Sequence, residues 1–124
     1  MDIYREAILD HYKHPHNFGH LVKPDAKVEE GNVTCGDRII IELKVKSAKS
    51  KVIEDIRFSG EGCAISQAAA SLLTDKVKGM KTADVMKLAA RDMTNLLGTT
   101  LTPSRTKCAT LSLEVLHKAV ISLG

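Results

Sequence analysis

The amino-acid sequence predicts an α+β domain in which helices pack on one face of a small, three-stranded antiparallel sheet. Two patterns carry this prediction. The middle of the chain alternates apolar and polar residues with the period of two that a half-buried strand requires, whereas both flanking parts repeat apolar residues at helical spacing. Strands and helices are therefore segregated along the chain, as they are in α+β domains.

The first helix is expected over residues 2–12, where apolar and aromatic side chains recur on one helical face. It should end near His14, because Pro15 disfavours helical geometry in the residue that precedes it. A further proline, Pro24, keeps the following stretch irregular, so the sheet is expected to begin after it.

The clearest strand is expected over residues 39–46, where aliphatic side chains face one way and Glu42 and two lysines face the solvent. The aliphatic side chains are those of Ile39, Ile41, Leu43 and Val45. A polar connection leads to a second strand over residues 52–59, which completes an antiparallel hairpin. Residues 28–34 supply the third strand, although acidic residues and a glycine dilute its pattern.

Helical spacing returns over residues 63–79, which end at a glycine suited to a helix C-terminus. A further helix is expected over residues 82–97, and a last amphipathic helix is expected to begin at Cys108. The sequence shows no internal repeat, so we expect residues 1–124 to form a single domain.

Composition limits the classes to which the protein can belong. Its 124 residues, 44% hydrophobic and 27% charged, suit one domain. No uncharged apolar stretch reaches the roughly 18 residues that a membrane span needs, and the acidic N-terminus differs from a signal peptide, so a cytoplasmic protein with no membrane partner is expected. A spread net charge of +3, with two Tyr, two Phe and no Trp, gives little support to nucleic-acid binding.

The three cysteines are the most informative residues. An odd number in a reducing compartment argues against a disulfide framework and for thiols that serve metal or sulfur chemistry. Cys35, Cys63 and Cys108 are each expected at the boundary of an element, although a small buried side chain is the common alternative for a cysteine. In the first turn of a helix, Cys63 and Cys108 would feel the positive end of the helix dipole, which favours the thiolate form.

Three thiolates leave a tetrahedral metal site one ligand short. Asp37 is the local candidate for the fourth ligand, because Gly36 lets the chain turn so that Asp37 and Cys35 face one centre. An acid that only initiates a turn is the alternative. A site with three thiolates and one carboxylate suits zinc, and it holds an iron–sulfur cluster less tightly than four thiolates do. An exchangeable carboxylate ligand is useful in a protein that transfers its bound metal or cluster to another protein.

Three segments resemble one protein family. Residues 34–37 read Thr-Cys-Gly-Asp, residues 60–66 read Gly-Glu-Gly-Cys-Ala-Ile-Ser, and residues 107–111 read Lys-Cys-Ala-Thr-Leu. They are similar to the iron–sulfur cluster scaffold family that includes IscU, SufU and the N-terminal domain of NifU. The resemblance runs from about residue 3 to residue 121. It implies a SufE/NifU-like α+β fold and a pyridoxal-phosphate cysteine desulfurase as the sulfur donor. The implied ligands of a [2Fe–2S] cluster or of Zn²⁺ are Cys35, Asp37, Cys63 and Cys108.

The departures from the family pattern identify the branch. Lys107 stands where IscU-type members have a histidine, as it does in SufU-type members, but the long insertion common in SufU-type members before the third cysteine is missing. Residues 101–105 read Leu-Thr-Pro-Ser-Arg in place of a Leu-Pro-Pro-Val-Lys chaperone-binding motif, which argues against recognition by a dedicated Hsp70-type chaperone. Arg105 and Lys107 are auxiliary candidates that could neutralise thiolate or cluster charge, with solvated loop cations as the alternative.

Three functional hypotheses follow. In the first, the protein is a scaffold that accepts sulfur from the desulfurase, assembles a [2Fe–2S] cluster with iron and transfers it to recipient apo-proteins. Cys35 and Cys108 are then the candidate persulfide acceptors. In the second, Zn²⁺ binds the same residues and the protein is a sulfurtransferase partner that activates the desulfurase. In the third, a metal only stabilises an interaction module. The first makes the protein a scaffold rather than a true enzyme.

Four histidines fall within ten residues and raise the question of a second metal site. They are His11, His14, His16 and His20. The first lies on the apolar stripe of the N-terminal helix and the others flank a proline break, so we interpret all four as residues without a ligand role.

Overall fold

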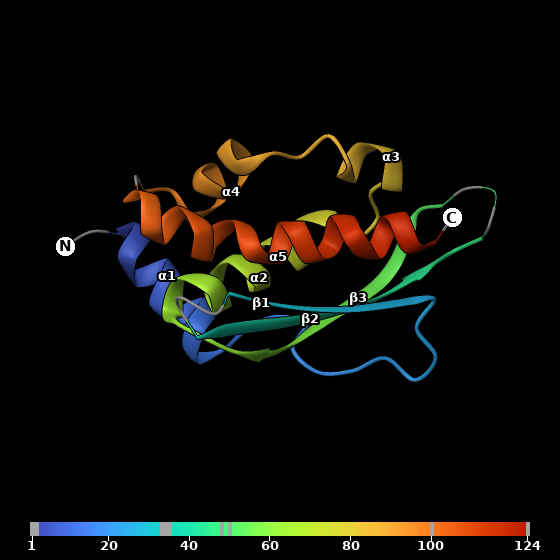
Figure 1. Ribbon diagram of the computed structural model, residues 1–124, viewed down its shortest axis with the longest axis horizontal. Coiled ribbons are helices and arrows are strands. Elements are labelled where there is room, and N and C mark those ends of the chain that lie inside the picture. The colour runs from blue at the N-terminus through green and yellow to red at the C-terminus, as the bar shows by residue number, and fades with distance from the viewer. Residues whose placement is uncertain (1–2, 33–35, 48, 50, 100, 124) are drawn as a thin grey trace.

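The computed structural model describes residues 3–32, 36–47, 49, 51–99 and 101–123. Within these residues the elements follow the predicted order of helix, strands and helices (Figure 1). They are α1 (Ile3–Lys13), β1 (Ala26–Asn32), β2 (Asp37–Val45), β3 (Ile53–Glu61), α2 (Ala64–Val77), α3 (Thr82–Val85), α4 (Ala90–Leu97) and α5 (Pro103–Ser122). Helices α2 to α5 lie on one side of the sheet, and α1 packs along α2, so the predicted α+β architecture is confirmed.

The sheet has the strand order β1-β2-β3, and both neighbouring pairs are antiparallel. In the middle of the sheet, Ile41 of β2 lies opposite Val28 of β1 and Phe58 of β3. The weak pattern over residues 28–34 therefore did indicate a strand, and that strand begins at Ala26.

Two segments of the chain close the outer edge of β3. The Phe58 N–H donates to the Asn17 carbonyl at 2.9 Å, and the Gly19 N–H donates to the Phe58 carbonyl at 2.9 Å. Near the start of the strand, Ile53 exchanges a similar pair of backbone hydrogen bonds with residues 79–80. The segment that follows α1 thus runs along β3 and then passes beneath the sheet to reach β1 (Figure 1).

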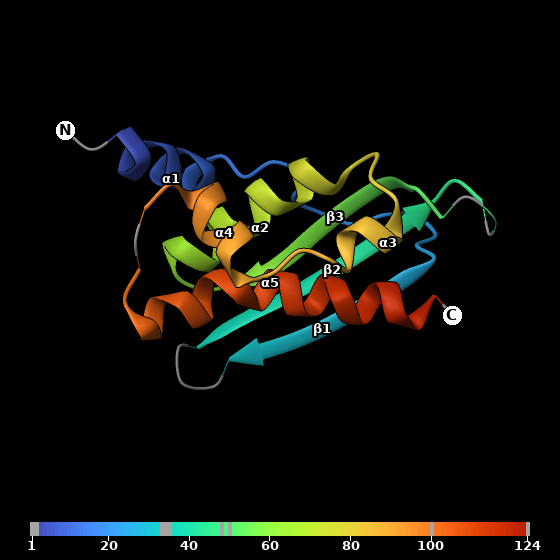
Figure 2. The same ribbon diagram turned by 90° about the horizontal axis from the view of Figure 1, so that it is seen from above.

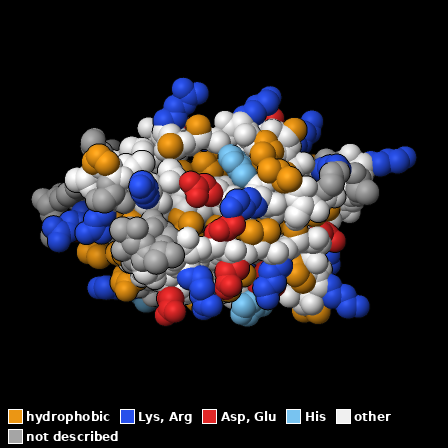
Figure 3. All heavy atoms as spheres, in the orientation of Figure 1, with side chains coloured by type: hydrophobic (Ala, Val, Ile, Leu, Met, Phe, Trp, Pro, Cys, Tyr) orange, Lys and Arg blue, Asp and Glu red, His pale blue; other side chains and the backbone are white. Residues whose placement is uncertain are grey.

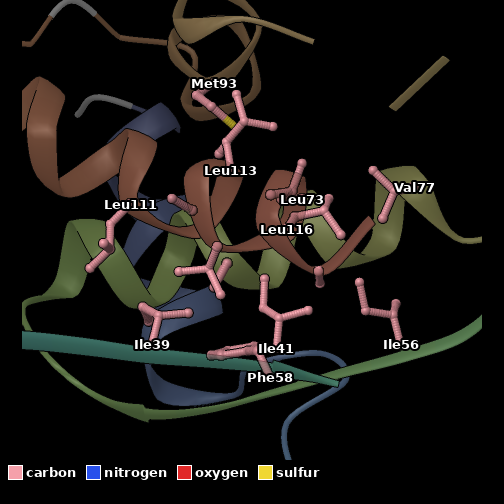
Figure 4. Close-up of a cluster of buried hydrophobic side chains, with 14 of the residues drawn as sticks. Ile39, Ile41, Ile56, Phe58, Leu73, Val77, Met93, Leu111, Leu113 and Leu116 are labelled. Carbon is pink, nitrogen blue, oxygen red and sulfur yellow. The ribbon is translucent and has the colours of Figure 1, made fainter. Parts of the chain in front are cut away.

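The core lies between the sheet and the helical layer. Helix α5 lies over β1 and β2, and α2 packs against α1, α5 and β3 (Figure 2). Residues 68–70 of α2 are alanines with no exposed surface, and their small side chains let α2 approach its neighbours closely. On α5, Leu111 and Leu116 point toward the sheet, whereas Leu113 points toward Met93 of α4 (Figure 4).

The single helix predicted over residues 82–97 is wrong, because two shorter helices replace it. The first, α3, ends at Val85, whose carbonyl accepts a hydrogen bond from His117 Nε2 at 3.0 Å. The second, α4, begins after Ala89, where the backbone is extended and its N–H donates to Asp92 Oδ2 at 2.7 Å. A carboxylate that binds the backbone in this way caps a new helix instead of continuing the previous one.

The last helix begins at Pro103 and not at Cys108 as expected. Thr102 caps it, because its hydroxyl oxygen accepts the Arg105 N–H at 3.4 Å. Proline is tolerated in the first turn, where a backbone N–H would have no helical partner. Cys108 consequently lies in the second turn of α5, where it is 3% exposed.

Glu42, which was expected to face the solvent, is buried. Its Oε2 lies 2.6 Å from His20 Nδ1, and its Oε1 accepts the Leu21 N–H at 3.4 Å. The segment beneath the sheet therefore covers part of the face that the strand pattern indicated as wet.

The surface shows no dominant patch of one charge on the face drawn in Figure 3, where basic and acidic side chains are interspersed. Among the described residues, no helix combines the length and the apolar character that crossing a membrane requires.

Candidate metal and sulfur site

The structure brings three of the four expected ligands to one place. Asp37 is the first residue of β2, Cys63 immediately precedes α2, and Cys108 lies in α5. One ligand atom from each, a carboxylate oxygen and two sulfurs, lies within 4.8 Å of the others. Cys35, the fourth expected ligand, lies outside the residues that the structure describes.

Asp37 is buried and uses its two oxygens differently. Its Oδ1 accepts the Cys63 backbone N–H at 2.9 Å, and its Oδ2 lies 3.9 Å from Cys63 Sγ. One oxygen therefore fixes the backbone of the neighbouring ligand, and the other remains directed toward the sulfur. As a metal ligand, Asp37 would offer a single oxygen.

Gly62 makes this arrangement possible. A Cβ at this position would lie 2.4 Å from Asp37 Oδ1 and 2.5 Å from Ser66 Oγ, closer than non-bonded atoms approach. The sequence indicates Gly62 only as a break after the strand. Its role in admitting the carboxylate and the hydroxyl to the site depends on a contact with β2 that local sequence does not reveal.

Cys63 is the N-cap residue of α2, as its predicted place at the boundary required. Its backbone is extended and its side chain makes no capping hydrogen bond, so the sulfur is not committed to the helix. Ser66, in the first turn of α2, donates its hydroxyl to the Cys63 carbonyl at 3.0 Å and also lies 3.9 Å from Cys63 Sγ. Ser66 is 1% exposed and was not identified from the sequence.

Cys108 occupies a different environment from the one expected. Because α5 begins at Pro103, Cys108 does not lie in the first turn, and the argument that the helix dipole activates it is wrong. Its burial inside a helix also contradicts the expectation that every cysteine lies at an element boundary. It reaches the site because α5 packs over β2, whose first residue is Asp37, and against α2, which Cys63 precedes.

The donor set fits a thiophilic metal. Zinc binds thiolates at about 2.3 Å, so two ligands of one tetrahedral zinc lie about 3.8 Å apart. A separation of at most 4.8 Å between the three ligand atoms needs only a small contraction to meet this geometry. Two sulfurs and one carboxylate oxygen are also chemically suited to zinc or to the irons of a cluster. Within the described part of the chain this is the group of ligand side chains compact enough to hold a metal.

A groove lies beside the site, with a volume of about 450 Å³. Leu9 of α1 and Leu101 before α5 contribute to its apolar lining, and Arg5 and Arg105 also line it. Ala64, the neighbour of Cys63, also lines it, so the groove and the ligand set are adjacent. Neither arginine forms an ion pair with another described residue. Lys107, the other auxiliary candidate, is exposed.

Three of the four clustered histidines bridge separate elements. His11 Nδ1 lies 2.7 Å from Ser71 Oγ, and His16 Nδ1 lies 2.5 Å from Asp75 Oδ2. These contacts join α1 and the segment after it to α2, and His20 holds Glu42 of β2 in the same manner. These three histidines therefore have structural contacts between elements, which the sequence did not predict.

The histidine contacts shift two pKa values. Burial lowers the pKa of His11, and the nearby His16 lowers it further. Burial raises the pKa of Asp75, but hydrogen bonds from His16 and Asn17 outweigh that effect, and the net pKa of Asp75 is lowered.

Comparison with known proteins gives a consistent result. The family described as NifU-like N terminal domain matches residues 3–123. The zinc-dependent sulfurtransferase SufU of Bacillus subtilis (strain 168) is 38% identical over 135 aligned positions, covering 95% of this chain and 89% of SufU. The iron–sulfur cluster assembly scaffold protein IscU of Aquifex aeolicus (strain VF5) is 38% identical over 117 positions, covering 94% of this chain and 73% of IscU. The alignment with SufU is longer than this chain, so SufU carries residues that are missing here.

Solved structures share the fold. The putative iron–sulfur cluster assembly scaffold protein for the SUF system from Fervidobacterium islandicum AW-1 superposes with a TM-score of 0.80 at 26% identity, covering 93% of this chain and 94% of that one. A second structure, described only as that of a hypothetical protein, gives a TM-score of 0.82 at 32% identity over 96% of this chain and 97% of that one.

Proposed function

We propose, since this chain belongs to the family of NifU-like N-terminal domains, that it is an iron–sulfur cluster assembly scaffold. It accepts sulfur from a cysteine desulfurase, assembles a [2Fe–2S] cluster with iron and passes the cluster to apo-proteins. The observation that carries the proposal is the convergence of Asp37, Cys63 and Cys108, three residues distant in sequence, on one point. Cys35 completes the proposed ligand set from its position two residues before Asp37.

Asp37 gives the site a ligand that can be exchanged. A carboxylate oxygen binds zinc or iron less strongly than a thiolate does. Its other oxygen is held by the Cys63 N–H, so the side chain keeps its place when the ligating oxygen is displaced. A site of this kind holds a cluster long enough to complete it and then releases it to a recipient that offers a stronger ligand.

Sulfur transfer proceeds by thiol–persulfide exchange. A scaffold thiolate attacks the outer sulfur of the desulfurase persulfide, a new S–S bond forms, the old one breaks, and the desulfurase cysteine leaves as a thiolate. Of the two candidate acceptors, Cys108 is 3% exposed, and attack by a buried sulfur requires its cover to move. We therefore favour Cys35 as the first acceptor.

A zinc-bound sulfurtransferase is the second candidate function. It is favoured by Lys107, which replaces the histidine of IscU-type members, and by the similarity to the zinc-dependent sulfurtransferase SufU. In this function the same four residues would hold Zn²⁺, which would order the site, and the thiolates would stay masked until a partner group replaced Asp37.

The groove beside the site is the proposed binding site of the desulfurase. Its apolar lining and its two lining arginines suit a segment with an apolar side chain flanked by carboxylates. Because the groove adjoins Cys63, a partner bound there places its persulfide next to the ligand set.

One experiment separates the two functions. The protein is purified without oxygen, its zinc and iron contents are measured, and it is then incubated with ferrous iron, cysteine, a desulfurase and a thiol reductant. The scaffold function predicts visible absorption of a [2Fe–2S] cluster that Cys63→Ser weakens. Faster desulfurase turnover by the zinc form, with no cluster absorption, selects the sulfurtransferase. If neither cluster absorption nor faster desulfurase turnover is seen, and removing the metal only unfolds the domain, both functions are rejected and the protein is a structural module.

A further inference from the structure

Cys63 Sγ has two oxygen neighbours that differ in hydrogen-bonding capacity, since a carboxylate oxygen only accepts and a hydroxyl both accepts and donates. Asp37 Oδ2 and Ser66 Oγ are each 3.9 Å from the sulfur. As a thiol, Cys63 can donate its S–H to either oxygen. Once it has lost that proton to become a ligand, the sulfur only accepts, and of these two neighbours only the hydroxyl can still donate to it.

We propose that Ser66 is a positioning residue of the metal site, whose hydroxyl donates a hydrogen bond to the Cys63 thiolate when that sulfur binds a metal. This inference rests on the proposed function only in requiring that the site bind zinc or a cluster. The Ser66 hydroxyl, in the first turn of α2, would then orient the Cys63 sulfur and withdraw electron density from it.

The local geometry supports a hydroxyl that can change partner. At present the Ser66 O–H points to the Cys63 carbonyl, 3.0 Å away, and rotation about the Cβ–Oγ bond redirects it without moving a heavy atom. Both acceptors belong to Cys63, so the exchange stays within one residue. Ser66 is 1% exposed, and water therefore competes little for its hydroxyl.

The surroundings also keep the hydroxyl close to the sulfur. Ser66 Oγ occupies space beside Gly62 that any Cβ would fill, since such an atom would lie 2.5 Å from it. Asp37, the other polar neighbour of the sulfur, is held by the Cys63 backbone N–H. The carboxylate thus serves as ligand and the hydroxyl as donor, and neither can take the other's role.

Partners that donate to metal ligands typically change metal affinity by about 10- to 100-fold when they are removed. A hydrogen bond to a thiolate also lowers the energy of the sulfur lone pair from which charge-transfer absorption arises. Ser66→Ala should therefore weaken zinc binding by about tenfold and move thiolate-to-cobalt charge-transfer absorption of the cobalt-loaded protein to longer wavelength.

The test uses the full-length chain loaded with Co²⁺, and with Zn²⁺ in competition with a chromophoric chelator. Ser59→Ala is the matched control, because Ser59 is also buried but its hydroxyl has no partner in the described part of the chain and lies on β3. Ser66→Thr keeps the hydroxyl and should restore the wild-type spectrum. Thermal unfolding of the metal-free variants checks that each is folded.

A shift of the charge-transfer absorption in Ser66→Ala, but not in Ser59→Ala, supports the inference. A wild-type spectrum in Ser66→Thr strengthens it. Identical cobalt spectra and zinc affinities in the wild type and Ser66→Ala overturn it, as does an equal shift in Ser59→Ala. If the wild type binds neither metal, the proposed function fails as well. If it binds metal and only the shift is missing, this inference alone is rejected.

Discussion

The carboxylate of Asp37 holds the backbone of Cys63 with one oxygen, 2.9 Å from the amide nitrogen, and directs the other toward the sulfur of the same residue. The end of β3 and the start of β2 are thereby joined through the site itself. The two oxygens can be separated experimentally because an amide side chain preserves one of their functions.

Replacing Asp37 by Asn should weaken metal binding and leave the loop in place. The amide oxygen can still accept the Cys63 N–H, but the amide nitrogen is not an anionic ligand. Asp37→Ala leaves that part-buried N–H without its partner and should lower the free energy of unfolding by about 1 kcal/mol. Denaturant unfolding of the metal-free proteins, with zinc affinity measured in parallel, distinguishes the two variants. Equal stability of Asn and Ala variants would contradict the anchoring role.

Gly62→Ala should damage both stability and metal binding. The added Cβ meets Asp37 Oδ1 at 2.4 Å and Ser66 Oγ at 2.5 Å, and relieving such overpacking typically costs about 1–3 kcal/mol. Gly79→Ala is the control, because Gly79 has a φ of +87° but nothing within 4 Å of the added atom. Both variants should lose stability, and only Gly62→Ala should lose zinc affinity. A Gly62→Ala protein with normal affinity would show that the site tolerates the contact.

Stability should fall as the pH drops below about 6.5, the ordinary pKa of histidine. Burial and the neighbouring His16 lower the pKa of His11, so the unfolded chain binds a proton at a higher pH than the folded protein does. The contribution of His11 is therefore complete above that pH and is lost as pH falls toward the folded pKa. Thermal unfolding from pH 8 to pH 5 should show a smaller decrease for His11→Gln than for the wild type. His14→Gln, an exposed neighbour, should keep the wild-type slope.

Charge reversal of the two arginines that line the groove should slow association with the desulfurase. Arg5→Glu and Arg105→Glu remove the positive charges that would steer an acidic segment, and the association rate at low salt should fall about tenfold. Arg91→Glu, an exposed residue of α4, should have little effect. Surface plasmon resonance at two salt concentrations measures the change, which should shrink at high salt. Unchanged association rates in both the Arg5 and the Arg105 variant would show that the desulfurase binds elsewhere.

The sheet and the helices α1 and α2 were predictable from the sequence, because each depends on a local pattern of apolar residues. Ile41 and Leu43 alternate with Glu42 and Lys44, and this period predicts the buried face on which both lie. The break between α3 and α4 was missed because it depends on Asp92 binding the backbone of Ala89, while apolar spacing continues across the gap.

Of the candidate site, only the candidate ligand residues could be predicted from the sequence. Cysteine and aspartate side chains are common metal ligands, so Asp37, Cys63 and Cys108 were candidates from the sequence alone. The structure then shows that they converge. Ser66 and Gly62 carry no such signal, because a serine in a helix and a glycine after a strand are ordinary in sequence. Their roles arise from atoms of β2 and α2 that meet only in the folded chain.

The backbone hydrogen bonds at the outer edge of β3 affect how the protein behaves at high concentration. An uncovered strand edge can pair with the edge of another molecule and start aggregation. Phe58 and Ile53 already use their edge-facing backbone groups on the chain itself. The opposite edge, β1, carries Lys27, Glu29 and Glu30, and charged side chains of this kind discourage pairing between molecules. Contacts between molecules through the sheet edges are therefore disfavoured, and partners of the proposed ligand set do not compete with self-association of the sheet.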